Sequence, residues 1–264
     1  MLENWQPKRL VKMIPFVVAL VGNRRSGKST LQSWILENVL SNEFDLIISF
    51  AGSVSCSPEL REFFVKRGQT NMMFDSMSIP FLDKLIEQQE EIKENRLGRR
   101  RVLLILDDAQ LDKNEELYLG TFCTRARHFD TSIMQASVSY TGISKNFRRS
   151  LDCLMLFSVG MHSDRKLLLQ EFSRNPKLSH YAMMDLEKYQ CLVQEKDFKS
   201  ELFYYRLELD SPEQVLQNPI EQFEDKNESS EQNESLSENK PLDDNLCALD
   251  ESQNTTLIDE SDPL

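Results

Sequence analysis

The chain contains a series of short, almost wholly apolar runs, separated by stretches in which apolar residues recur every three or four positions. These runs are FVVALV (16–21), DLIISF (45–50), RVLLILD (101–107) and CLMLFSV (153–159), and the more mixed run TSIMQASVSY (131–140) predicts a further strand. A strand that is apolar on both faces is typical of a parallel sheet covered on both sides, because neither face meets water. The pattern therefore predicts five buried strands.

The stretches between these runs have the spacing of amphipathic helices. Leu31, Trp34, Ile35 and Val39 form one face of a predicted helix directly after the first strand. Similar spacing predicts helices within 79–97, 115–128 and 163–174, and two further runs, 188–195 and 201–209, predict a closing pair of strands. This alternation predicts an α/β fold with a mainly parallel central sheet flanked by helices.

The composition changes near residue 210. Residues 208–264 hold seventeen Asp and Glu against Lys226 and Lys240, whereas the whole chain has a net charge of −12. The preceding residues therefore carry a charge of about +3, which is compatible with a nucleic-acid partner. A segment rich in Asp, Glu, Asn, Gln and Ser cannot bury enough apolar surface to offset its conformational entropy. We predict an α/β domain over 1–210 and an acidic disordered tail over 211–264, which serves as a solubilising appendage, a DNA mimic or a tether for a partner.

Several features bear on the compartment. The five cysteines have no C-x-x-C spacing, which favours reduced thiols over a disulfide framework or a metal site. The N-terminus lacks the basic-then-apolar pattern of a signal peptide, and the apolar run MIPFVVALV is about half of the roughly 20 residues that a membrane helix needs. We expect a cytoplasmic protein that is neither secreted nor inserted into a membrane.

The segment GNRRSGKS matches the phosphate-loop pattern G-x-x-x-x-G-K-[ST] in full, and it lies between a predicted strand and a predicted helix. In such a loop, backbone N–H groups surround the β-phosphate, the lysine reaches the β- and γ-phosphates and the serine ligates Mg²⁺. The last two roles fall on Lys28 and Ser29. The predicted nucleotide-binding residues are Gly22, Asn23, Arg24, Arg25, Ser26, Gly27, Lys28, Ser29 and Thr30.

Two carboxylates end the apolar run RVLLILDD. Asp107 is expected to hold Mg²⁺ together with Ser29. In ATPases with an extra strand between the Walker A and Walker B strands, the acidic residue after this ligand polarises the attacking water, which assigns that role to Asp108. The strand DLIISF and the long gap before Asp107 fit this class of P-loop NTPase. The alternative for Asp108 is an ordinary turn residue at a strand end.

Other nucleotide enzymes fit less well. The N-K-x-D and D-x-x-G motifs of guanine-specific proteins do not occur at the expected places, and no LSGGQ signature is present. The region after DDAQ lacks the arginine-rich lid of small nucleotide kinases. Hydrolysis of ATP is therefore preferred, and a nucleotide-gated switch with slow hydrolysis is the alternative. A kinase of a small acceptor is a third possibility.

The block FCTRARHFDTSIMQASVSYTGISKNFRRSLDCLMLF resembles part of the ATPase core of the poxvirus-type viral genome-packaging ATPases, within the FtsK/HerA superfamily of DNA motors. Arg127 and His128 match an Arg-His pair that ends a helix, and Ser139 and Tyr140 match an aromatic loop after the next strand. SKNFRR matches the arginine element, with Arg148 in register. The resemblance extends over roughly residues 14 to 160, including the phosphate loop and the paired aspartates.

This resemblance implies an ATP- and Mg²⁺-dependent motor that moves double-stranded DNA into a viral or virus-like capsid. It also implies a homo-oligomeric ring, a capsid protein as a further partner, and a location in the host cytoplasm or the virion. In such rings an arginine from one subunit completes the site of its neighbour, an effect worth about 10³–10⁵ in rate in GTPases. Arg148 is our first candidate, and Arg149, Arg125 and Arg127 follow. The alternative is that these arginines form surface ion pairs or contact DNA phosphates.

The chain departs from the family at the sensor position. The family usually has Gln directly before the Ser-Tyr pair, whereas this chain has Val138 there and Gln135 three residues earlier. Gln135 is the sensor candidate, although an offset of three along a strand changes the face. Arg24 and Arg25 are expected to face the nucleotide, a neighbouring subunit or DNA, and the alternative is a solvated edge. The predicted catalytic residues are Lys28, Asp108 and Arg148.

Overall fold

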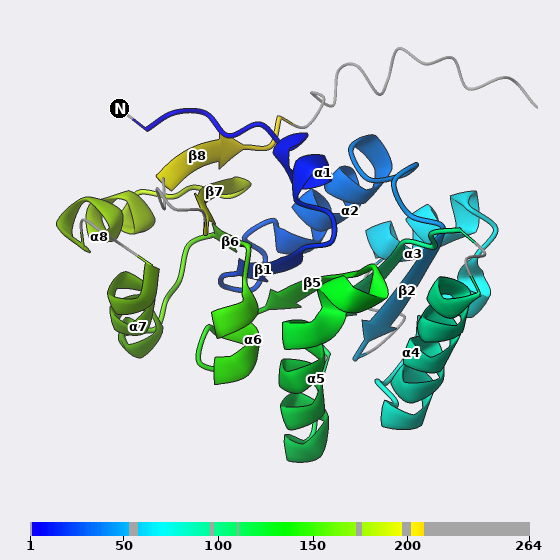
Figure 1. Cartoon of the computed structure of the whole chain (residues 1–264). Helices are drawn as coiled ribbons and strands as arrows, with labels where there is room; N and C mark the ends of the chain where they lie inside the picture. Colours follow the sequence, from blue (N-terminus) through cyan, green and yellow to red (C-terminus); the bar gives the residue numbers. More distant parts are fainter. Residues whose placement is uncertain are drawn as a thin grey trace, which may run out of the picture. The chain divides into compact units, whose positions relative to one another are not determined.

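The predicted apolar runs form the centre of an eight-stranded sheet, in the order β3-β2-β4-β5-β1-β6-β7-β8 (Figure 1). The computed structural model describes residues 2–52, 58–95, 98–109, 111–172, 176–196 and 202–208. The five predicted strands are β1 (Val17–Val21), β2 (Leu46–Ala51), β4 (Val102–Asp107), β5 (Thr131–Ser137) and β6 (Cys153–Leu156). Every residue of β1 and β4 is buried, as expected of central strands covered on both faces.

Six of the strands run parallel, and the last two run antiparallel to their neighbours. β1 pairs in parallel with both β5 and β6, and β4 pairs in parallel with β2 and β5. The short β3 (Met73–Phe74) adds to the edge of β2. β7 (Gln190–Glu195) and β8 (Leu202–Arg206) are the predicted closing pair. The predicted α/β class with a mainly parallel sheet is confirmed.

The strand that lies between β1 and β4 is β5. The sequence suggested the extra strand from DLIISF, which lies between the two motif strands along the chain. That run forms β2 instead, on the far side of β4 from β1. The fold thus has the expected interposed strand, but a later segment of the chain supplies it, since order in sequence does not fix order in a sheet. This arrangement places the ends of β1, β5 and β4 side by side.

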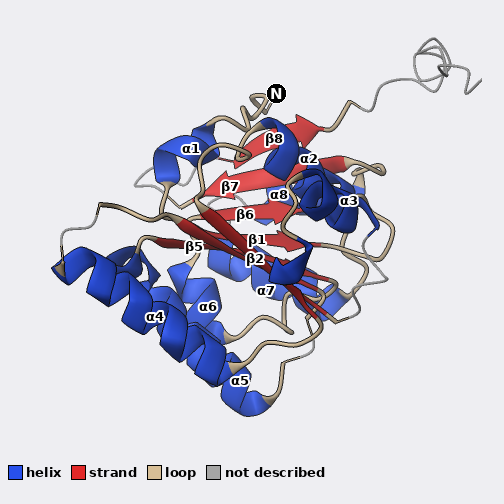
Figure 2. Cartoon of the chain, turned by 90° about the vertical axis from the view of Figure 1, so that its right-hand side faces the viewer, coloured by secondary structure: helices blue, strands red, loops and turns tan. Residues whose placement is uncertain are grey.

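Helices cover both faces of the sheet (Figure 2). One face packs against α1 (Arg9–Met13), α2 (Lys28–Asn38) and α3 (Pro58–Lys66), whose buried side chains share a cluster with Val18, Leu20 and Ile105. The other face packs against α4 (Ile79–Glu94), α5 (Lys113–Arg125), α6 (Lys145–Ser150), α7 (His162–Phe172) and α8 (Pro176–Met184). Alternate residues of the buried strands enter the two clusters, as the period of a strand requires.

The remaining sequence predictions have mixed outcomes. The predicted helices within 79–97, 115–128 and 163–174 are present, the second ending in a 3-10 turn (Ala126–Phe129). The sequence did not identify α3, which follows a mixed segment without clear periodicity. The predicted acidic tail, 211–264, lies outside the described residues. In the described part of the chain, no helix combines the length and apolar character that crossing a bilayer requires.

Candidate functional site

The phosphate-loop sequence forms a tight turn from the end of β1 into α2. Gly27 has φ 104°, in the left-handed region that glycine tolerates best. No side chain caps the N-terminus of α2, so its first backbone N–H groups have no side-chain acceptor at the cap. Gly22 packs closely on the segment directly after β6, where an added Cβ would lie 2.5 Å from Cβ of Phe157. Both glycines of the motif are therefore required by the geometry.

The loop is held in place by the segments around it. The N–H of Gly22 donates to the carbonyl of Ser137 at 3.2 Å, and the N–H of Asn23 donates to Ser158 at 2.8 Å. The side-chain Oδ1 of Asn23 accepts from the N–H of Gly160 at 2.9 Å. Asn23 therefore fixes the loop to the segment after β6, and a bound phosphate would meet a preformed backbone cradle.

Lys28 is buried and bound to its own loop. Its Nζ donates to the carbonyl of Gly22 at 2.8 Å and to that of Asn23 at 2.9 Å. Burial lowers the pKa of Lys28 from its ordinary value, and the carboxylates of Asp108 and Asp107 act in the opposite direction. An ammonium held in a desolvated loop beside two carboxylates is suited to bind a phosphate group.

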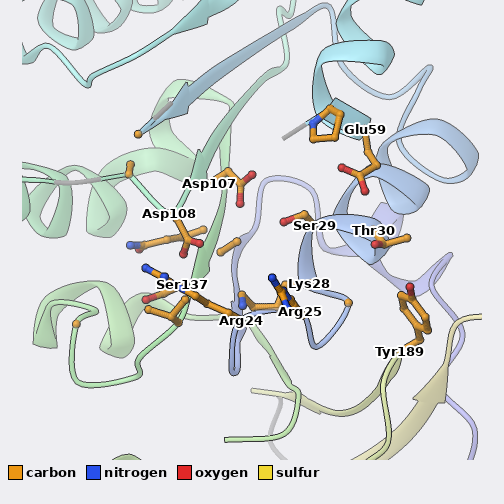
Figure 3. Close-up of a pocket in the computed structure, with 18 of the residues that line it drawn as sticks. Arg24, Arg25, Lys28, Ser29, Thr30, Glu59, Asp107, Asp108, Ser137 and Tyr189 are labelled. Atoms are coloured by element: carbon orange, nitrogen blue, oxygen red, sulfur yellow. The ribbon is translucent and has the colours of Figure 1, made fainter. Parts of the chain in front are cut away.

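Asp107 and Asp108 occupy the end of β4, but they differ in exposure. Asp107 is buried at 6% exposure, whereas Asp108 is exposed. Asp108 has φ 44°, and its N–H donates to the carbonyl of Ala136 at 3.2 Å. A left-handed residue other than glycine is uncommon, and Asp and Asn are among those that tolerate this region, so the turn after β4 suits an aspartate. Figure 3 shows both carboxylates at the same hollow as Ser29 and Lys28.

These elements enclose a cavity of about 950 Å³ at the carboxyl ends of β1, β4 and β5. Its walls come from the phosphate loop and the start of α2, the ends of β4 and β5, the start of α3 and the turn before β7. Ligands of open α/β folds bind at this edge of the sheet. Its size is within the range of small-molecule sites.

Gln135, the sensor candidate, lies in the wall of this cavity and is 8% exposed. Its Oε1 is buried and has no hydrogen-bond partner among the described residues. An unsatisfied buried acceptor is costly unless a ligand or water contacts it. The offset from the family position thus leaves Gln135 at the cavity, while Val138 also lines it.

Arg24 and Arg25 both line the cavity and are exposed. Arg25 has φ 63°, a second left-handed residue in the loop. Neither side chain forms a hydrogen bond or an ion pair with another residue in the described ranges. Their guanidinium groups are therefore available to a ligand or a partner.

Arg148, which the sequence placed in the catalytic set, does not line the cavity of its own chain. Its Nη1 lies 3.2 Å from Oε1 of Glu171 on α7, and its guanidinium lies over the ring of Tyr140 at 5.0 Å. Only 13% of its side chain is exposed. Its predicted action on a neighbouring subunit stays a prediction, because it concerns a contact between chains.

The other candidate arginines also lie away from the cavity walls. Arg127 pairs with Asp152, and Arg125 stacks over Phe129 at 5.2 Å. The side chain of Arg149 is exposed on α6. Each is a surface side chain of the isolated chain, and none is among the described residues that line the cavity.

Sequence reasoning missed several residues of the cavity wall. Ser137 ends β5, Glu59 opens α3, and Lys188 and Tyr189 precede β7. None belongs to a motif, and only the sheet order brings them to the phosphate loop. The loop after β5 is held by Asp164 of α7, which accepts from the Ser139 hydroxyl at 2.9 Å and from the N–H groups of Tyr140 and Thr141.

The residues present fit a nucleoside triphosphate with Mg²⁺. No described side chain caps the first N–H groups of α2, and a bound phosphate would accept hydrogen bonds from them. The buried Oε1 of Gln135 has no partner in the described ranges, and the attacking water would donate a hydrogen bond to it. No group of three or more His, Cys, Asp or Glu able to hold a metal occurs in the described part of the chain. Mg²⁺ does not need such a group, since it is commonly held by one or two protein ligands and the substrate phosphates. Ser29 and Asp107 would hold it.

Comparison with known proteins gives one family and a set of similar folds. A family model described as "Poxvirus A32 protein" matches residues 3–190. No curated protein sequence matches the chain. Several solved structures resemble the chain at sequence identities of 13–14%, and at that level the resemblance establishes the fold alone.

The chain resembles the genome packaging NTPase B204 from Sulfolobus turreted icosahedral virus 2 in complex with AMP, with a TM-score of 0.54, 14% identity and coverage of 78% of this chain and 100% of that one. It also resembles the DNA-packaging ATPase B204 from Sulfolobus turreted icosahedral virus, with a TM-score of 0.57, 14% identity and coverage of 74% and 99%. ATPases 2 and 3 of EssC from Geobacillus thermodenitrificans match with a TM-score of 0.52 and 13% identity over 77% of this chain and 42% of that one.

Proposed function

Because the chain belongs to the poxvirus A32 protein family, we propose that it is an ATP-hydrolysing motor that moves double-stranded DNA into a viral or virus-like capsid. The observation that carries this proposal is the convergence of Lys28, Asp107 and Asp108 on one cavity of the size of a nucleotide site. B204, whose fold this chain shares, is described as a DNA-packaging ATPase and as a genome packaging NTPase, which supports the same function.

Hydrolysis requires water to attack the γ-phosphorus while the bond from that phosphorus to the bridging oxygen of ADP breaks. The backbone of the phosphate loop and Lys28 hold the β- and γ-phosphates, and Mg²⁺ held by Ser29 and Asp107 would neutralise part of their charge. Asp108 orients the water and accepts hydrogen bonds from it, because its carboxylate is exposed at the cavity beside Lys28. Gln135 lines the same cavity, where its Oε1 can accept a hydrogen bond and its amide nitrogen can donate one.

The motor role also needs partners. We propose a homo-oligomeric ring in which Arg148, or another arginine of 125–149, reaches the γ-phosphate of a neighbour. Arg24 and Arg25 contact DNA or the adjoining subunit, since they are exposed and have no partner among the described residues. A capsid protein is a further partner, and the protein acts in the host cytoplasm or in the virion.

The test measures phosphate release from ATP with and without duplex DNA, using Lys28→Ala as the inactive control. The mass in solution is measured in parallel with a non-hydrolysable ATP analogue. We expect turnover that rises several-fold with duplex DNA, together with a mass of several subunits. Tight ATP binding with a monomeric mass and turnover indifferent to DNA would overturn the motor and favour a nucleotide-gated switch.

A further inference from the structure

The cavity has an end that the proposed chemistry does not use. Asp108 and Ser137 lie on one side, whereas Thr30 and Tyr189 lie on the other (Figure 3). Lys188 adjoins Tyr189 and also lines the cavity. In a nucleotide held by its phosphates on the loop, the sugar and base extend away from the γ-phosphate. The Tyr189 end is therefore where the rest of the nucleotide has room to lie.

Tyr189 is fixed to the phosphate loop through its backbone. Its N–H donates to the carbonyl of Ser26 at 3.0 Å, and its own carbonyl accepts from the N–H of Leu207 at 3.0 Å. Its φ of 67° is left-handed, a conformation that persists only where the surroundings enforce it. The residue therefore connects the end of β8 to the loop that would hold the phosphates.

The ring of Tyr189 packs directly on the loop. A Cβ added to Gly27 would lie 2.6 Å from Cδ1 of Tyr189, so the glycine leaves room for the ring as well as for the phosphates. Tyr189 is half-buried, which leaves part of the ring open to the cavity. Its position relative to the loop is thus set before a ligand binds.

The exposed ammonium of Lys188 lies over this ring, 4.6 Å from its centroid. Lys188 forms no ion pair with a residue of the described ranges, and its ammonium contacts the ring of Tyr189 instead. A cation–π contact made by an exposed lysine is weak, so a ligand can displace the ammonium from the ring. An aromatic ring beside a phosphate site, with an exposed lysine ammonium over it, is a surface on which a nucleobase can stack.

We propose that Tyr189 is the stacking platform for the nucleobase of the bound nucleoside triphosphate, with Lys188 as its movable cover. This inference rests on the proposed nucleotide site. Stacking recognises the aromatic plane and its area, so it favours a purine over a smaller pyrimidine and does not by itself distinguish adenine from guanine. Tyr189 is thereby a specificity-determining residue that contacts the substrate away from the reacting phosphate.

The experiment compares binding of a non-hydrolysable ATP analogue with binding of inorganic tripolyphosphate, which has the phosphates but no base, by calorimetry with Mg²⁺. The variants are Tyr189→Phe, Tyr189→Leu and Tyr189→Ala. Asp185→Ala, an exposed residue that does not line the cavity, is the control and should bind both ligands as wild type does. We expect the Leu and Ala variants to weaken the ATP analogue by about 5- to 150-fold, the range that loss of one stacked base represents. Tripolyphosphate affinity stays within about twofold, and Tyr189→Phe keeps wild-type affinity, because the ring and not the hydroxyl makes the contact.

Equal losses for the analogue and for tripolyphosphate would show that Tyr189 only supports the loop, and would overturn the inference. Unchanged binding of the analogue in folded Tyr189→Leu would overturn it too. If Tyr189→Ala fails to fold, Tyr189→Leu retains bulk without an aromatic face and decides the question. Wild-type protein that binds neither ligand would overturn the nucleotide site itself. Wild-type binding with turnover indifferent to DNA would overturn only the motor.

Discussion

Two groups of arginines in this chain have opposite environments. Arg24 and Arg25 lie in the phosphate loop, are exposed, and have no ion-pair or hydrogen-bond partner among the described residues. Arg148 lies on α6 with 13% of its side chain exposed, paired with Glu171 and stacked on Tyr140. The first group can meet added phosphates without losing any contact of its own. Arg148 would have to leave its ion pair with Glu171, whose side chain is 34% exposed.

This difference changes how the arginine motif is interpreted. Resemblance to packaging ATPases assigned the catalytic arginine to Arg148, yet within one chain that residue joins α6 to α7. The Tyr140 hydroxyl donates to Oε2 of the same Glu171 at 2.6 Å. A trans role for Arg148 therefore requires that ring assembly or nucleotide binding break this cluster. The loop arginines need no such rearrangement.

The largest expected effect lies at the phosphate loop. We expect Lys28→Ala to lower turnover by at least about 100-fold, because it removes the cation that stabilises charge on the transferred phosphoryl group. The measurement is phosphate release at saturating ATP. Thermal unfolding serves as the control, and an Ala variant that turns over ATP at the wild-type rate would remove the loop from the mechanism.

The next effect tests the cluster around Arg148. Arg148→Ala removes the ion pair with Glu171 and the contact with the Tyr140 ring, and we expect the free energy of unfolding to fall by about 1–2 kcal/mol. Arg149→Ala, which removes an exposed neighbour on the same helix, should change it by less than about 0.5 kcal/mol. Urea denaturation of both variants measures the difference.

A mixing experiment separates the two roles of Arg148. If the residue acts on a neighbour, mixing Arg148→Ala with Asp108→Asn should restore part of the turnover, since some sites then combine an intact Asp108 with an intact Arg148. No restoration, together with the stability loss above, would leave Arg148 as a structural residue. Equal stability of Arg148→Ala and Arg149→Ala would contradict the cluster.

A smaller effect is expected from the loop arginines. The double variant Arg24→Ala, Arg25→Ala should bind ATP normally but show DNA stimulation reduced several-fold, with a weaker dependence on salt. The control with the same loss of charge is Arg99→Ala, Arg100→Ala, which removes two cations before β4, at the amino ends of the strands, and also breaks the ion pair of Arg99 with Asp130. Equal losses in both double variants would mean that total charge, and not the loop position, matters.

The smallest effect concerns the loop after β5. Burial raises the pKa of Asp164, but hydrogen bonds from Ser139, Tyr140 and Thr141 outweigh it, so the pKa lies below its ordinary value of 3.8. A carboxyl with a depressed pKa stabilises the fold above its unfolded pKa, and this contribution is lost as the pH falls through the folded pKa. Near neutral pH, the free energy of unfolding of the wild type should exceed that of Asp164→Asn by about 1 kcal/mol. This difference in free energy should become smaller in acid, and urea denaturation at several pH values measures it. A difference that does not change with pH would contradict a stabilising role of the ionised carboxylate.

The sequence predicted the parts of the molecule that depend on local pattern. The buried strands follow from continuous apolar runs, and the phosphate loop follows from glycine spacing that only one backbone shape satisfies. Sheet order depends on tertiary packing, so the sequence placed the interposed strand at DLIISF, whereas β5 occupies that position. Tyr189 and Lys188 reach the cavity only through this order, and their local sequence has no motif.

The placement of individual side chains was least predictable. Gln135 is a glutamine, the residue type expected of a γ-phosphate sensor. Its place in the cavity wall follows only from the register of β5 in the sheet. The partner of Arg148 is 23 residues away, on α7, so no spacing rule identifies it. Motifs therefore predicted the chemistry, and the fold determined which charged residues are available for it.

The variant Asp108→Asn isolates the proposed role of Asp108 in activating water at the carboxyl ends of the strands. Asparagine tolerates the left-handed backbone that Asp108 adopts, so the variant removes the charge while keeping the turn. The measurement is single-turnover phosphate release together with ATP affinity. We predict affinity within about threefold of wild type and release slower by about 10²–10⁴-fold. Release at the wild-type rate would contradict the account.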